Sequence, residues 1–289
     1  MKTIGHDITK FLKHVFRVCL TRVLPPTFFL GWLLLIFLTP PGAANPEKFI
    51  VYFYSSETNI NTFKSLKMEF DSYLAKFGDY EFQPFSDRKT FEEQVKDKPR
   101  CLVLLSSWHY ANIHKAYVLK PMLVGVRNGQ KYQKRILVAS ESAANIESVK
   151  TGPIASASSA QHTLSTLGEM FKDQDPVKNF KILTVPKDID ALMSVGFGMA
   201  KSALITENSL ETLKTVNPPL YKKLKIVAES KESLLLIIAA PESFVTDAEK
   251  MIGIIQNMST DPDGEKKIKM LGLEGWQTFD PSDESKVEG

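Results

Sequence analysis

The chain has 289 residues, of which 43% are hydrophobic and 24% are charged, and its formal net charge is +3. This is the composition of an ordinary globular protein. The net charge is too small to indicate a nucleic-acid-binding surface, and the sequence contains no RNA- or DNA-binding motif. Its two cysteines, Cys19 and Cys101, have no spacing with histidine that would indicate a metal site, so we expect neither a metal nor a cofactor.

The first 44 residues have the pattern of an export signal. Residues 1–26 are basic, residues 28–38 (FFLGWLLLIFL) are apolar, and small residues follow up to Ala44. Because the apolar run is short for a transmembrane helix, we predict that residues 1–44 are a signal peptide, with an uncleaved N-terminal anchor as the alternative. About 245 residues would remain after cleavage, which is enough for one large or two small domains.

From residue 48 onward, strand-like and helix-like segments alternate. The β-branched and aromatic run at 48–54 (KFIVYFY) predicts a buried strand, and the apolar run at 100–105 (RCLVLL) predicts another. Between them, the sequence predicts a helix at 63–74, a short strand at 80–84 and a polar helix at 87–96.

The second half of the chain continues this alternation. It predicts strands at 119–126, 134–139, 180–185, 202–205, 224–227 and 234–239, and helices at 142–150, from about 188 to 195, and at 210–215, 244–258 and 265–271. Alternating strands and helices predict an α/β protein with largely parallel sheets.

A serine-rich stretch at 151–171 (TGPIASASSAQHTLSTLGEMF) stands out. Ser156, Ser158 and Ser159 directly precede a segment with helical spacing that starts near Gln161. Serine oxygens there can accept the unpaired N–H groups of a helix N-terminus, and the same helix end can hold an anion. From these residues alone, a helix cap and an anion site both remain open.

The sequence offers little evidence of catalysis, because the usual hydrolase, nucleotide-binding and metalloprotease motifs are missing. Ser158 or Ser159 with His162 would lack a third partner and have poor triad geometry. His109 is expected to be a rim or packing residue. Asp188 and Asp190 lie at a predicted helix start, where they compensate the helix dipole. We therefore predict no catalytic residues.

Several segments together resemble one known family. They are FIVYFYSSETNINTFKSLKMEF (49–70), RCLVLLSSWHY (100–110), the serine-rich stretch, GMAKSALITENSLETLKTVNPPLYKKLKIVAES (198–230) and MSTDPDGEKKIKMLGLEGWQTFD (258–280). In this order they are similar to the periplasmic phosphonate/phosphate/phosphite-binding proteins of ABC importers. The resemblance covers most of residues 48–280.

This resemblance implies a type II periplasmic-binding-protein-like fold with two lobes, each a mixed, mostly parallel sheet flanked by helices. Lobe I would comprise residues 46–133 and 231–289, and lobe II residues 134–230. The protein would be a periplasmic monomer and not an enzyme. It would capture a small oxyanion and deliver it to an ABC permease in the inner membrane. A membrane-anchored sensing or scaffold domain of the same fold is the alternative, and a transferase-like enzyme is a weaker third possibility.

The resemblance also implies the ligand-binding residues. The expected set is Ser55, Ser56, Ser106, Tyr110, Ser158, Ser159, Asp188 and Lys201. Asp188 falls near an acidic ligand position of the family. Lys201 stands where members that bind aminophosphonates carry a carboxylate, and a lysine cannot receive the ligand amine. Lys201 would add a positive charge if it faces the cleft, and is otherwise a solvated lysine at a strand start.

Overall fold

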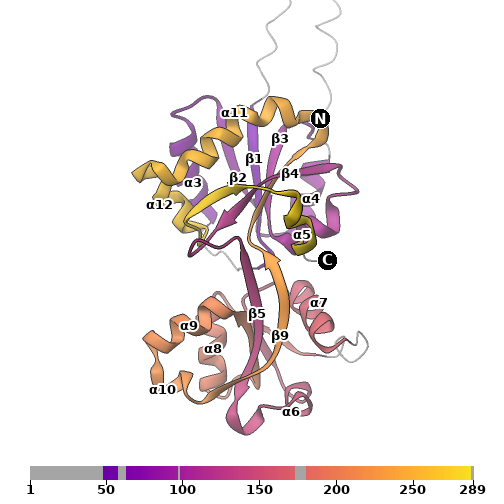
Figure 1. Ribbon diagram of the computed structural model, residues 1–289, viewed down its shortest axis with the longest axis vertical. Helices are drawn as coiled ribbons and strands as arrows, with labels where there is room; N and C mark the ends of the chain where they lie inside the picture. Colours follow the sequence, from indigo (N-terminus) through magenta and orange to yellow (C-terminus); the bar gives the residue numbers. More distant parts are fainter. Residues whose placement is uncertain (1–47, 58–62, 97, 173–179, 288–289) are drawn as a thin grey trace, which may run out of the picture. The chain divides into compact units, whose positions relative to one another are not determined.

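The computed structural model describes residues 48–57, 63–96, 98–172 and 180–287, so the predicted export signal lies outside the described residues. The described strands form two mixed sheets with helices on both faces (Figure 1). This arrangement confirms the predicted α/β class. No helix in the described ranges combines the length and apolar character needed to cross a bilayer.

The six-stranded sheet has the order β11-β4-β10-β3-β1-β2. Its strands are β1 (Phe49–Tyr54), β2 (Tyr80–Pro84), β3 (Cys101–Leu105), β4 (Leu119–Val126), β10 (Ile237–Pro241) and β11 (Gly275–Thr278). One face packs against α3 (Phe63–Leu74), α11 (Val245–Gln256) and α12 (Pro262–Met270), and the other against α4 (Arg88–Lys96) and α5 (Ser107–Ile113). The strands β1, β2 and β3 are parallel, which places their carboxyl ends at one edge of the sheet.

The five-stranded sheet has the order β7-β6-β8-β5-β9. Its strands are β5 (Tyr132–Ser140), β6 (Ile154–Ser156), β7 (Ile182–Thr184), β8 (Ser202–Thr206) and β9 (Leu224–Leu234). One face packs against α6 (Ile146–Lys150) and α7 (Ala160–Phe171), and the other against α8 (Asp188–Gly196), α9 (Glu207–Val216) and α10 (Pro218–Tyr221).

The chain passes between the two sheets twice, through neighbouring segments. The first passage follows β4 and contains a turn in which Asn128 and Gly129 both have positive φ, the conformation that an Asn-Gly turn favours. The second passage lies between β9 and β10, where the Leu235 N–H donates to the Lys131 carbonyl at 2.9 Å. The predicted lobe boundaries, at 133/134 and 230/231, fall within the paired strands β5 and β9 and stay a prediction.

The structure differs from the predicted elements in a few places. Among the described strands, four pairings are parallel and five are antiparallel, so the sheets are mixed but less parallel than expected. The strands β6 and β11 were not predicted. Residues 106–110, for which no helix was predicted, provide the cap and first turn of α5, and β9 is one strand that starts at the predicted 224–227 segment.

Candidate ligand-binding site

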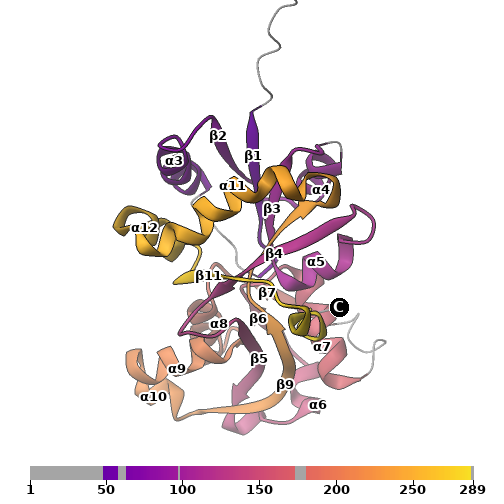
Figure 2. The same cartoon turned by 45° about the horizontal axis from the view of Figure 1, so that its top comes forward.

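The candidate site lies where the carboxyl ends of strands from the two sheets meet. Ligands of open α/β proteins bind at such ends. The segment 55–57 follows β1, α5 follows β3, and α7 follows β6. Both Figures 1 and 2 place α5 beside α7, and the rings of Trp108 on α5 and His162 on α7 stack with centroids 5.0 Å apart.

The six-stranded sheet contributes a pair of buried serines. The Ser56 and Ser106 hydroxyls lie 2.5 Å apart, and their side chains are 1% and 0% exposed. Ser106 also caps α5, because its oxygen accepts the His109 backbone N–H at 3.3 Å. Ser55 is less buried, and its hydroxyl accepts the Glu57 backbone N–H at 3.2 Å.

The five-stranded sheet contributes a second hydroxyl cluster around the start of α7. Ser159 is the N-cap of this helix and accepts the His162 backbone N–H at 3.3 Å, so the predicted cap is present. Ser156 accepts the Ser158 backbone N–H at 3.2 Å and lies 3.0 Å from the Thr163 hydroxyl, which donates to it. Ser156, Ser158 and Thr163 are all fully buried. Four hydroxyl groups are thus gathered at one helix N-terminus.

The two clusters are in direct contact. The Ser159 N–H donates to the Ser56 carbonyl at 2.8 Å, and the Ser158 hydroxyl donates to the Glu57 carbonyl at 3.4 Å. In this structure, two carbonyl groups of the segment after β1 therefore occupy donors at the start of α7.

A buried charge pair, which the sequence patterns did not reveal, lies beside these contacts. The Arg135 Nη2 atom is 3.3 Å from Glu57 Oε2, and the Gln133 amide donates to the same oxygen at 2.6 Å. Only 2% of Arg135 and 8% of Glu57 is exposed. Arginine is almost never fully buried without a partner. A charged residue directly before the apolar run 136–139 was therefore the available sequence signal.

Two of the predicted ligand-binding residues, Tyr110 and Lys201, lie away from the serine clusters. Tyr110 is a core residue whose hydroxyl donates to the Leu119 carbonyl at 3.3 Å, and burial raises the pKa of this phenol. Lys201 is exposed and directly precedes β8, with its N–H donating to the Pro153 carbonyl at 2.9 Å. Because β6 and β8 are parallel, Lys201 lies at their amino ends, opposite the end that carries Ser156.

Asp188 lies at the same edge as the serines but has a structural role. Its Oδ2 atom accepts the Thr206 N–H at 2.8 Å, the Thr206 hydroxyl at 3.0 Å and the Ser209 hydroxyl at 2.9 Å. These contacts join the start of α8 to the start of α9. This oxygen is therefore already satisfied by the protein.

His109 is a packing residue, as its sequence context indicated. Its ring packs against Tyr54 and Phe91, and its Nε2 atom is 2.9 Å from Glu92 Oε1. Burial lowers the pKa of His109 to about 4, so the ring is neutral at pH 7 and donates its Nε2 proton to the carboxylate. No group of three or more His, Cys, Asp and Glu side chains in the described ranges is placed to hold a metal ion.

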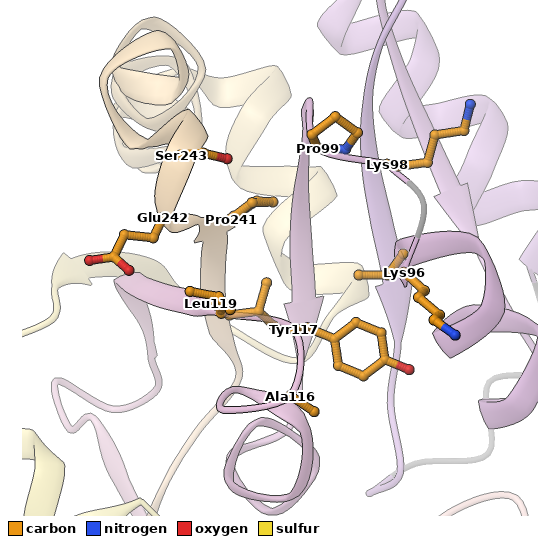
Figure 3. A pocket seen from close by; sticks show the side chains of 11 residues that line it. Lys96, Lys98, Pro99, Ala116, Tyr117, Leu119, Pro241, Glu242 and Ser243 are labelled. Atoms are coloured by element: carbon orange, nitrogen blue, oxygen red, sulfur yellow. The ribbon is translucent and has the colours of Figure 1, made fainter.

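A separate hollow of about 650 Å³ lies on the six-stranded sheet (Figure 3). It is lined by the end of α4, by Pro99 before β3, by Tyr117 and Leu119 at the start of β4, and by Pro241 at the end of β10. Since β3 begins here, the hollow is at the edge opposite the serine clusters. It does not belong to the candidate site.

The sequence matches a family model described as ABC transporter, phosphonate, periplasmic substrate-binding protein, over residues 63–284. No curated protein sequence matches the chain significantly.

Solved structures show the same fold at low sequence identity. A Xanthomonas citri protein determined with bound ATP has a TM-score of 0.61 at 11% identity, covering 83% of this chain and 94% of its own. PhnD1 of Prochlorococcus marinus, in complex with methylphosphonate, has a TM-score of 0.60 at 14% identity, covering 82% and 94%. A binding protein component of an ABC phosphonate transporter from Pseudomonas aeruginosa has a TM-score of 0.58 at 13% identity, covering 82% and 83%.

These likenesses confirm the two-lobed fold, and the family model spans most of the chain. The chain therefore belongs to the family of periplasmic phosphonate substrate-binding proteins of ABC transporters, whose members bind solutes and are not enzymes.

Proposed function

We propose that the protein captures a small oxyanion, such as a phosphonate, phosphate or phosphite, between its two sheets and delivers it to the permease of an ABC importer. The observation that carries this proposal is the hydroxyl cluster at the start of α7, facing Ser56 and Ser106. A tetrahedral oxyanion is held by several converging N–H and O–H donors, and a helix N-terminus adds a favourable dipole.

Binding requires the contacts between the two clusters to open. The Ser56 and Glu57 carbonyls now accept donors from the start of α7, where the oxyanion would be held. We propose that lobe I (46–133 and 231–289) and lobe II (134–230) separate about the two passages between the sheets. Hinge motion about a few connecting residues is a common way for binding proteins to admit a ligand.

The location and partners follow from the same proposal. Residues 1–44 would direct export and be removed, leaving a monomer in the periplasm that docks on an inner-membrane permease. Mass spectrometry of the mature N-terminus tests this step. An intact Met1 on the exported protein would instead support a membrane-anchored sensing domain.

A ligand panel tests the oxyanion class directly. Protein lacking residues 1–44 would be heated with phosphate, phosphite, methylphosphonate and related oxyanions. A ligand present at 100 times its Kd stabilises the fold by about 2.7 kcal/mol, which a thermal shift detects. The absence of a shift with every member of the panel would rule out this ligand class.

Two matched serine variants test the position of the site. Ser158→Ala removes a buried hydroxyl from the cluster at α7, and we expect about a tenfold or greater loss of affinity, as for a hydrogen bond to a charged group. Ser194→Ala is the control, because its buried hydroxyl also donates to a carbonyl, that of Asp190 at 2.8 Å, but on α8. Equal affinities of the two variants, measured by calorimetry, would place the ligand elsewhere.

A further inference from the structure

Arg135 has more hydrogen-bonding capacity than its surroundings use. It lies on β5, directly before four buried residues, 136–139, and its own exposure is 2%. Its Nη2 atom contacts Glu57 at 3.3 Å. Among the described residues, its Nε and Nη1 atoms have no acceptor.

Glu57, in turn, has a hydrogen-bond acceptor that its surroundings do not use. Its Oε2 atom accepts the Gln133 amide and contacts Arg135, whereas no described residue donates to its buried Oε1 atom. Each carboxylate oxygen can accept two hydrogen bonds. One side of this carboxylate therefore has no partner within the described part of the chain.

This geometry is poor for a pair whose purpose is stability. Buried charges offset their loss of hydration only when the pairing is close and the remaining donors and acceptors are satisfied. Here a single guanidinium nitrogen makes the contact, and two buried donor atoms and one buried acceptor atom have no partner within the described ranges. Unsatisfied buried polar atoms are rare in native proteins and call for a functional explanation.

The pair adjoins the serine clusters and joins the two sheets. Glu57 follows β1 on the six-stranded sheet, and Arg135 is on β5 of the other sheet. The Glu57 carbonyl accepts the Ser158 hydroxyl. A ligand whose oxyanion sits at Ser158 can therefore present a second group, a short distance along its chain, to Arg135.

We infer that Arg135 is a ligand-binding residue that takes the carboxylate of a bifunctional ligand, a phosphonate that also carries a carboxyl group, and that Glu57 occupies Arg135 when this ligand is absent. A guanidinium binds carboxylates and tetrahedral oxyanions alike through paired hydrogen bonds, so the choice of a carboxylate rests on the contact that Arg135 makes with Glu57. The Glu57 carboxylate shows that this group fits beside Arg135. The inference rests on the proposed function and adds the class of substrate.

Calorimetry with two probes tests the inference. Methylphosphonate carries only the phosphonate, and phosphonoacetate adds a carboxylate. We expect the wild-type protein to bind phosphonoacetate at least tenfold more tightly than methylphosphonate. Equal binding of the two probes, or tighter binding of methylphosphonate, would overturn the inference that Arg135 binds a ligand carboxylate, while leaving the proposed function in place. Binding of neither probe would overturn the inference, and the wider oxyanion panel would then decide the proposed function separately.

Substitutions then assign the preference to the pair. Glu57→Gln keeps the shape of the side chain but removes the negative charge that competes with the ligand carboxylate for Arg135. Phosphonoacetate should therefore bind more tightly to this variant than to the wild type. The double variant Glu57→Gln/Arg135→Gln removes both charges of the pair, so neither is left unpaired. It should lose the preference for phosphonoacetate and still bind methylphosphonate. Binding of methylphosphonate also shows that the variant folds. Lys134→Gln, the neighbouring residue on β5, should leave the preference unchanged. A preference that survives in the double variant would assign the pair a purely structural role.

Discussion

Removing Arg135 alone is expected to destabilise the protein strongly. In Arg135→Met, the Glu57 carboxylate, which is 8% exposed in the wild type, loses the one cationic side chain that contacts it among the described residues. Removing one partner of a buried ion pair reduces the free energy of unfolding by about 3–5 kcal/mol. For a chain of this size the loss corresponds to a fall in Tm of about 6–20 °C.

The adjacent lysine provides a matched control. Lys134 is also on β5 and pairs with Glu229 at 4.0 Å, but the two side chains are 37% and 51% exposed. Lys134→Met should therefore change the free energy of unfolding by less than about 1 kcal/mol. Urea denaturation of both variants, with Tm from calorimetry, measures the difference.

The double variant Glu57→Leu/Arg135→Met tests the physical reason for the loss. It removes both charges, so we expect it to recover most of the stability that Arg135→Met loses. The reasoning is refuted if Arg135→Met unfolds within about 1 kcal/mol of the wild type, or if the double variant is no more stable than the single one.

Three further predictions concern sites away from the serine clusters. Burial lowers the pKa of His109 from 6.5 to about 4. Between these two pH values the imidazole is protonated in the unfolded chain but neutral in the folded protein. The free energy of unfolding should therefore fall by about 3 kcal/mol as the pH is lowered from 6.5 to 4. His109→Gln should flatten that part of the pH–stability curve, and an unchanged curve would contradict the pKa. Burial raises the pKa of the Cys101 thiol to about 12. In protein lacking residues 1–44, which retains Cys101 but not Cys19, Ellman's reagent at pH 8 should label the thiol only in denaturant, and rapid labelling of the native protein would be the opposite result. A Cβ on Gly264 would lie 2.5 Å from a backbone oxygen, whereas one on Gly253 would meet nothing within 4 Å. Thermal denaturation should therefore show a loss of about 1–3 kcal/mol for Gly264→Ala and no loss for Gly253→Ala, and equal values would refute the steric argument.

The elements predicted from the sequence were those whose own residues define them. The apolar runs of β1 and β3 and the helical spacing of α3 and α7 are local patterns, and each of these elements is present. The strands β6 and β11 have three and four residues and no run long enough to show a period. They form because neighbouring strands offer backbone partners, β7 and β8 for β6 and β4 for β11.

The same distinction applies to the site. Capping by Ser159 could be predicted because cap and helix are adjacent in sequence. Lys201 and Tyr110 could not be placed, because the end of the sheet and the face of the helix on which each lies depend on tertiary packing. The Glu57–Arg135 contact joins residues from different sheets, so no local pattern marks it. Only the occurrence of Arg135 before an apolar run pointed to a buried charge.

The contact between the two clusters sets a condition on any ligand of the proposed site. The Ser159 N–H and the Ser158 hydroxyl already donate to carbonyls of the segment after β1, so binding exchanges acceptors and does not simply fill free donors. A neutral carbonyl held by the fold loses little entropy in making this contact. A charged oxygen accepts roughly twice as strongly, and several of its oxygens can be bound at once. If the ligand is held at this position, as we propose, an oxyanion displaces the carbonyls more readily than a neutral solute of the same size, and the exchange selects for negative charge.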